Sequence, residues 1–149
     1  MNTTNEKLNQ VLSIIDEEYQ QSNYKSYFGG FEQNACSNYL TTNGTKELHK
    51  CTTRVIKRVQ DECNLIVTRT NPKCFYFKCE NMYYVFDYLT LVCSIDCKNN
   101  TLNYRWDDYS ATTKNHINTV LDTIGYKGLF KADIMYACYY TELLKLEKK

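Results

Sequence analysis

The middle of the chain, residues 64–106, constrains the fold more than any other segment. Val, Ile, Phe, Tyr and Thr dominate it, and residues of these types are enriched in strands. Pairs of turn-forming residues interrupt it at Asn71-Pro72, Glu80-Asn81 and Asn99-Asn100. Short strands separated by such turns predict an antiparallel β-meander. We expect strands near residues 64–70, 74–79, 82–88, 91–97 and 101–106.

Part of the same segment also fits a helix. Between residues 81 and 97, the apolar residues that recur at helical spacing are Met82, Val85, Phe86, Leu89, Val92 and Cys93. Periodicity alone does not distinguish a buried strand from a buried helix in a short apolar segment. A mostly α-helical fold with a cysteine-bearing helical hairpin is therefore the alternative.

Helices are predicted before the meander. Residues 4–22 follow a capping box formed by Thr3 and Glu6, and a short helical piece is expected over 32–40. A turn at Asn43-Gly44 and a cap at Thr45 then introduce a strongly amphipathic helix over 46–63. The apolar stripes of the two long helices are Leu8, Val11, Leu12, Ile15 and Tyr19, and Leu48, Cys51, Val55, Ile56 and Val59.

Two helices are predicted after the meander. One has the stripe Ile117, Val120, Leu121 and Ile124 and ends at Gly125. The last has the stripe Ile134, Ala137, Cys138 and Leu144, with Lys145, Lys148 and Lys149 at its C-terminal end. The expected fold is one α+β domain over residues 1–149, in which a small antiparallel meander (about 64–106) is flanked by N- and C-terminal helices.

Composition narrows the class of protein. A chain of 149 residues can bury a single core, and one proline and five glycines argue against a disordered linker. A net charge of +1 provides no global field that would steer the protein to nucleic acid or membrane. The start of the chain lacks the pattern of a secretory signal, which favours a cytoplasmic protein. The abundance of Asn, Lys and Tyr indicates an AT-rich genome.

The outline C-x5-R-T, from Cys63 to Thr70, resembles the phosphate-binding loop of cysteine-dependent phosphatases. That loop needs glycines at positive φ, whereas Leu, Ile and Val lie between Cys63 and Arg69. In an extended strand, Cys63 and Arg69 would be about 20 Å apart. The segment is therefore predicted to be the end of a helix that leads into a strand.

Other catalytic patterns are weak. His49 and His116 are the only histidines, and neither lies in a metalloprotease or hydrolase motif. A dyad of Cys138 and His116 has no support from the sequence, and the adjacent Asp107 and Asp108 diverge in regular structure. We therefore expect no catalytic residue, no cofactor and a protein that is not an enzyme.

The eight cysteines allow three interpretations. The spacing of Cys74, Cys79, Cys93 and Cys97 overlaps that of structural zinc sites, but strands would separate these thiols. If residues 46–70 and 73–97 were two antiparallel helices, Cys63 would face Cys79 and Cys51 would face Cys93. That arrangement resembles the twin-cysteine helical hairpins imported into the mitochondrial intermembrane space. The expected state is reduced, mostly buried cysteines without metal.

One helix face is the only local concentration of charge. Its cations are Lys46, Lys50, Arg54, Lys57 and Arg58. Such a row suits a phosphate backbone or an acidic protein surface. We expect a non-enzymatic docking protein that binds a larger assembly, possibly one that contains RNA, such as a ribosome. No membrane or small-molecule substrate is inferred. The alternative is a secreted or organellar disulfide-stabilised module, such as a host-directed effector.

Overall fold

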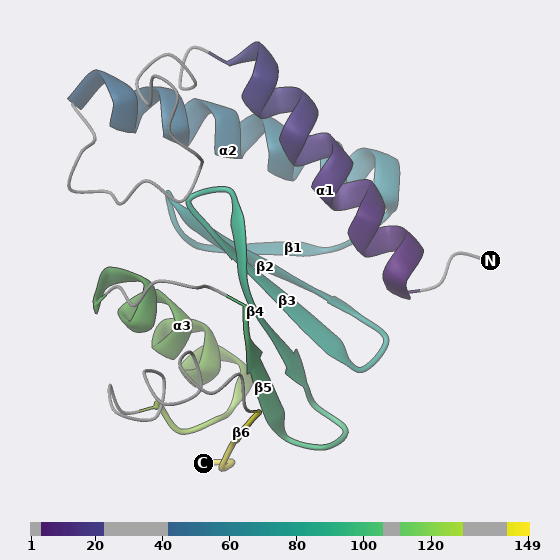
Figure 1. Cartoon of the computed structure of the whole chain (residues 1–149), viewed down its shortest axis with the longest axis vertical. Coiled ribbons are helices and arrows are strands. Elements are labelled where there is room, and N and C mark those ends of the chain that lie inside the picture. Colours follow the sequence, from purple (N-terminus) through teal and green to yellow (C-terminus); the bar gives the residue numbers. More distant parts are fainter. Residues whose placement is uncertain (1–3, 23–41, 106–110, 130–142) are drawn as a thin grey trace.

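The computed structural model describes residues 4–22, 42–105, 111–129 and 143–149 (Figure 1). Its helices are α1 (Thr4–Gln21), α2 (Thr42–Cys63) and α3 (Ala111–Ile124). Its strands are β1 (Val67–Asn71), β2 (Cys74–Cys79), β3 (Met82–Asp87), β4 (Thr90–Asp96), β5 (Thr101–Tyr104) and β6 (Leu144–Lys145). The strands form one antiparallel sheet in the order β1-β2-β3-β4-β5-β6. The predicted α+β meander is confirmed.

Residues 81–97 form the β3–β4 hairpin, so the helical alternative is wrong. Its turn consists of Tyr88 and Leu89, with φ values of 52° and 63°. Such turns usually contain Asn and Gly, and their absence made the segment resemble a helix. Apolar residues also occur at both odd and even positions of these strands, because both faces of the sheet are covered.

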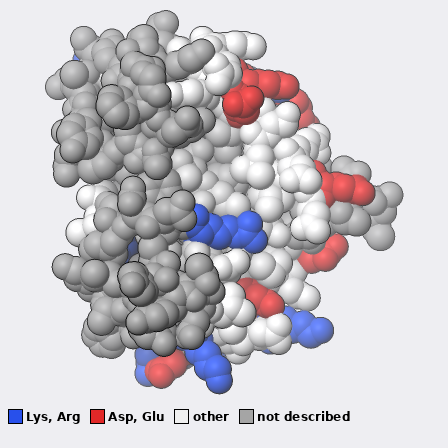
Figure 2. Space-filling view, viewed as in Figure 1, with Lys and Arg blue, Asp and Glu red and all other residues white. Residues whose placement is uncertain are grey.

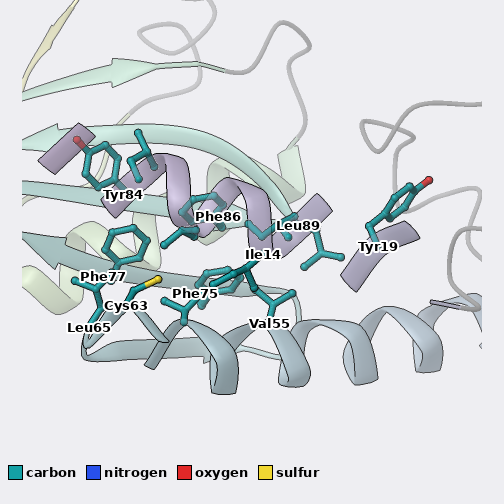
Figure 3. Close-up of a cluster of buried hydrophobic side chains, with 14 of the residues drawn as sticks. Ile14, Tyr19, Val55, Cys63, Leu65, Phe75, Phe77, Tyr84, Phe86 and Leu89 are labelled. Carbon is teal, nitrogen blue, oxygen red and sulfur yellow. The ribbon is translucent and has the colours of Figure 1, made fainter. Parts of the chain in front are cut away.

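The two faces of the sheet contribute to two separate cores. One face packs against α1 and α2, and its centre is formed by Phe75, Phe77 and Phe86 (Figure 3). The rings of Phe75 and Phe86 stack with their centroids 5.1 Å apart. The other face packs against α3, where Ile117, Val120 and Leu121 are fully buried. The layers are therefore α1 and α2, the sheet, and α3 (Figure 1).

The stripes predicted for α1 and α2 face the first core with one exception. In α2, Leu48, Cys51 and Val55 are fully buried. In α1, Leu12 is 38% exposed, and Ile14 is buried in its place. The predicted Asn43-Gly44 turn is wrong, because α2 already begins at Thr42.

The ends of α2 and α3 follow the sequence signals closely. α2 ends at Cys63, and Asn64 has a φ of 55°, which is the left-handed conformation typical of the position after a helix. α3 ends at Ile124, and Gly125 has a φ of 98°. The first strand was predicted to begin at residue 64. β1 begins at Val67, three residues later, because Asn64 adopts the left-handed conformation that follows the end of α2.

The predicted last helix does not reach Leu144. Leu144 and Lys145 form β6, which pairs with Leu102 and Thr101 of β5. Lys148 forms an isolated bridge with Tyr126. Pairing with β5 explains this outcome, because it supplies backbone partners at an edge of the sheet. Ile134, Ala137 and Cys138, and the short helical piece expected over 32–40, lie outside the described residues.

Within the described ranges, none of the helices has the length and apolar character needed to cross a bilayer.

Candidate functional site

The predicted basic face lies on the outer side of α2. Because the opposite stripe of the helix is buried, Lys46, Lys50 and Lys57 are turned to solvent. We call these three residues the lysine stripe. The ammonium of Lys50 lies 3.5 Å from Glu47, whereas Lys46 and Lys57 make no ion pair with another described residue.

Arg54 and Arg58, the other two cations of the predicted face, form ion pairs with acidic residues. Arg54 Nε donates to Glu18 of α1 at 3.0 Å. Arg58 binds Glu18 at 3.1 Å, Glu17 at 2.9 Å and Glu62 at 2.6 Å. The bonds to Glu62 and Glu17 raise the pKa of Arg58. Both arginines therefore join α2 to α1, and their charges are largely neutralised. Glu62 lies one turn along α2 from Arg58, whereas Glu17 and Glu18 come from α1, so inspection of α2 alone could not reveal these two partners.

The side of the molecule seen in Figure 2 carries charges of both signs. In Figure 2, acidic and basic side chains of described residues are both spread over the visible face. The sign of any docking surface therefore depends on which cations lack an acidic neighbour.

Arg69, on β1, is a cation that makes no ion pair with another described residue. Its guanidinium donates to Thr53 Oγ1 at 2.8 Å, to Pro72 O at 2.7 Å and to His49 O at 3.3 Å. All three acceptors are neutral, and no carboxylate of the described chain pairs with Arg69. Burial lowers the pKa of Arg69, and its Nε is buried without a hydrogen bond.

The position of Arg69 places it beside the lysine stripe. Arg69 contacts α2 at Thr53. Successive residues of a helix are rotated by about 100° around its axis, so Lys46, Lys50 and Lys57 lie within about 60° of Thr53 around that axis. Arg54 and Arg58 lie farther around the helix, on the side that meets α1. The lysine stripe is therefore flanked on one side by neutralised arginines and on the other by Arg69.

Lys73 and His49 extend this region toward the sheet. Lys73 Nζ lies 5.4 Å from the centroid of Tyr88. Burial, followed by the charges of Lys73 and Arg69, lowers the pKa of His49. Both cations are therefore close to this imidazole. We define the cationic surface as Lys46, Lys50, Lys57, Arg69 and Lys73.

A polar pair lies at the same end of the sheet. His116 Nδ1 of α3 is 2.7 Å from Asp87 Oδ2 at the end of β3. The side chain of Asp87 is fully buried, and burial raises its pKa while the bond to His116 opposes the rise. The ring of Tyr88 stacks against His116 at 6.3 Å.

Unpaired polar atoms concentrate in this region. Within the described residues, five buried side-chain nitrogen or oxygen atoms make no hydrogen bond, and four of them lie here: His49 Nε2, Arg69 Nε, Asp87 Oδ1 and Tyr88 Oη. The strained Tyr88-Leu89 turn lies in the same place. Backbone strain is more frequent at functional sites than elsewhere, and a buried unpaired polar group can be satisfied by a ligand or by water. The region therefore combines excess positive charge with features typical of a binding site.

The phosphatase interpretation is excluded by this geometry, as predicted. Cys63 is the last residue of α2, whereas Arg69 lies on β1 and binds Thr53 and two backbone carbonyls. Burial and the charge of Glu62 raise the pKa of Cys63, which is the opposite of nucleophile activation.

The cysteines of the sheet do not converge on one point. Cys74 and Cys93 are buried in the core against α3, whereas Cys79 is buried in the core against α1 and α2. Among the described residues, no cluster of His, Cys, Asp or Glu has the geometry of a metal site. The six described cysteines are free thiols, so the proposed Cys63–Cys79 and Cys51–Cys93 pairs are absent.

Comparison with protein families gives one match. The model of a family described as "Family of unknown function (DUF8033)" matches residues 34–135, about two thirds of the chain. The match includes α2, β1 to β5 and α3, and therefore the lysine stripe and the Asp87–His116 pair. Neither a curated protein nor a solved structure gives a significant match. The chain belongs to this family of unknown function.

Proposed function

We propose that this protein is a non-enzymatic docking protein that binds a phosphate-bearing partner through its cationic surface. A ribonucleoprotein is the kind of assembly that fits. The supporting observation is the state of Arg69, whose half-buried charge is bonded only to neutral oxygens. A buried charge without a counter-ion is costly, and a phosphate group placed beside it compensates that cost.

The lysine stripe supplies the approach to this site. Exposed lysines on one helix face attract a phosphate backbone at long range, and binding releases the counter-ions of that backbone. Arg69 and Lys73 then provide positive charge at the junction with the sheet. The proposed docking face therefore consists of the lysine stripe, Arg69 and the β1–β2 turn, whereas Arg54 and Arg58 pair with acidic residues of α1.

Charge reversal tests this proposal with a matched control. The variant Lys50→Glu/Lys73→Glu changes the cationic surface, whereas Lys98→Glu/Lys127→Glu makes the same change in net charge elsewhere. The probe is a fluorescein-labelled single-stranded RNA of about 20 nucleotides, measured by anisotropy at several salt concentrations. We expect salt-dependent binding that weakens at least about 10-fold in the first variant and less than about 2-fold in the control, since each lost phosphate contact weakens binding.

Two results would contradict the proposal. One is the absence of salt-dependent binding to RNA by the wild-type protein. The other is an equal loss of affinity in both variants. Poly-glutamate is used as a second polyanion: binding to it alone would replace the phosphate-bearing partner with an acidic protein surface.

A further inference from the structure

β1 forms one end of the sheet, and within the described chain it pairs only with β2. The free edge of a strand carries backbone N–H and C=O groups that can pair with another chain. The register with β2 is regular from Val67 to Arg69 and shifts between Arg69 and Asn71. The first part of β1 is therefore the part best able to accept a further strand.

An open groove lies at the beginning of this edge. Its volume is about 570 Å³, which is within the range of ligand-binding clefts. It is lined by residues of α1, of the α2–β1 connection, of β1 and of the β2–β3 hairpin, among them Lys7, Ile66, Thr68, Tyr76, Lys78 and Tyr83. The groove and the regular part of β1 form one continuous surface.

The apolar part of this surface is centred on Ile66. Its side chain is 87% exposed, the largest exposure of any large hydrophobic residue in the described structure. Thr68 follows two residues later, is also exposed, and is paired with Tyr76 of β2. Ile66, immediately before β1, and Thr68 of β1 both line the groove.

The charged part of the surface is basic. Lys7 and Lys78 line the groove, and Glu80 is the acidic residue among its lining. Lys78 Nζ lies 5.4 Å from the centroid of Tyr83, and Lys7 Nζ donates to the backbone oxygen of Cys63 at 3.3 Å. Neither lysine makes an ion pair with a described residue. An acidic side chain is the complement that these lysines lack.

We propose that the edge of β1 and this groove bind an extended segment of a partner protein by strand addition. The segment carries an aliphatic side chain that packs against Ile66. An acidic side chain two residues away, about 7 Å along a strand, faces Lys78 or Lys7. Backbone pairing with β1 provides affinity, and the alternating aliphatic and acidic side chains provide specificity.

The geometry of the tyrosines favours a peptide over single-stranded RNA. Stacking of a base requires an exposed aromatic face. Tyr76 is only 8% exposed, and its ring meets that of Tyr83 edge-on, with an interplanar angle of 63°. The groove also adjoins the end of α2, whereas the lysine stripe begins near its start. The two proposals share Arg69 of β1, but the lining of the groove contains no residue of the cationic surface.

A selection experiment tests the proposal without knowledge of the partner. The probe is a displayed library of random dodecapeptides, selected against the wild-type protein and against Ile66→Asp/Lys78→Glu. The control is Leu143→Asp/Lys127→Glu, which changes a 61% exposed leucine and an exposed lysine outside the groove. Circular dichroism verifies that each variant is folded. Peptides with alternating aliphatic and acidic residues are expected to be enriched by the wild type and by the control.

The selected peptides give a direct measure of the binding mode. We expect their affinity to fall at least 10-fold in Ile66→Asp/Lys78→Glu and to stay within 2-fold in the control. Amide hydrogen exchange at Val67–Arg69 is expected to slow when peptide is bound. The proposal is overturned if no such motif is enriched, if peptides leave exchange in β1 unchanged, or if an oligouridine displaces them from the groove.

Discussion

His116 Nδ1 lies 2.7 Å from the carboxylate of Asp87, and this contact connects α3 to the β3–β4 hairpin. Asp87 is at the end of β3, immediately before the strained turn formed by Tyr88 and Leu89. The pair therefore adjoins this turn, and the ring of Tyr88 contacts both Lys73 and His116. It also places an ionisable group in the core, which makes the stability of the protein depend on pH.

Asp87 is expected to contribute to stability in acid and to lose that contribution as the pH rises. Burial raises its pKa above the ordinary value of 3.8, so the folded protein binds this proton more tightly than the unfolded chain does. The contribution is fully present below pH 3.8 and disappears as the pH rises through the folded-state pKa. Urea unfolding of the wild type and of Asp87→Asn, from about pH 3.5 to about pH 7, measures the effect. With rising pH, the free energy of unfolding of the wild type should fall relative to that of Asp87→Asn. A difference between the two free energies that stays constant, or that changes in favour of the wild type, would contradict this prediction.

Glu18 is expected to hold α1 on α2 more strongly than Glu17 does. Glu18 accepts bonds from both Arg54 and Arg58 and its side chain is 13% exposed, whereas Glu17 pairs with Arg58 alone and is 51% exposed. Glu18→Gln should lower the free energy of unfolding by about 1 kcal/mol, and Glu17→Gln by less than about 0.5 kcal/mol. Chemical denaturation of both variants compares them. Equal effects would show that the contacts of Glu18 add nothing beyond those of an exposed ion pair.

Glu80→Gly is expected to stabilise the protein. Glu80 is exposed in the β2–β3 turn and has a φ of 57°, a conformation that glycine adopts without steric cost. We expect the free energy of unfolding to rise by about 0.5–1 kcal/mol, since relief of the left-handed strain exceeds the entropy that glycine adds to the unfolded chain. Thermal unfolding measures the change. Glu80→Ala is the control, because alanine removes the side chain but keeps the strain; a similar gain in both variants would assign the effect to the carboxylate.

The meander could be predicted from the sequence because most of its turns are chemically marked. Asn71-Pro72 and Asn99-Asn100 separate segments rich in β-branched and aromatic residues. The β3–β4 turn carries no such mark, because Tyr88 and Leu89 occupy the positive-φ positions where Asn and Gly are usual. β6 could not be predicted either, because a strand of two residues has no periodicity, and its existence depends on pairing with β5.

The candidate site was predicted only where it follows helical periodicity. The spacing of Lys46, Lys50 and Lys57 places them on one face once the opposite stripe is known to be apolar. Pairing of Arg58 with Glu18 joins residues 40 positions apart, and the contact of Asp87 with His116 joins residues 29 apart. Such contacts have no local signature. Arg69 belongs to the C-x5-R-T outline, but in the structure it binds the neutral oxygens of His49 and Thr53 and not a phosphate-binding loop.

Thiol reactivity distinguishes the reduced protein from a disulfide-stabilised module. Of the six described cysteines, Cys97 is half-buried and the other five are buried. Burial raises the pKa of Cys74 to about 12, and burial likewise raises the pKa values of Cys51, Cys63 and Cys93. These thiols should therefore be nearly unreactive at about pH 8, because the thiolate is the nucleophile.

Cys36 and Cys138 lie outside the described residues, so the test uses a variant in which both are serine. Under native, non-reducing conditions we expect Ellman's reagent to titrate one thiol rapidly, and Cys97→Ser should abolish that phase. After denaturation without reductant, six thiols should react in the test variant and eight in the wild type. A lower count would show disulfides and would favour the secreted or organellar alternative over a reduced docking protein.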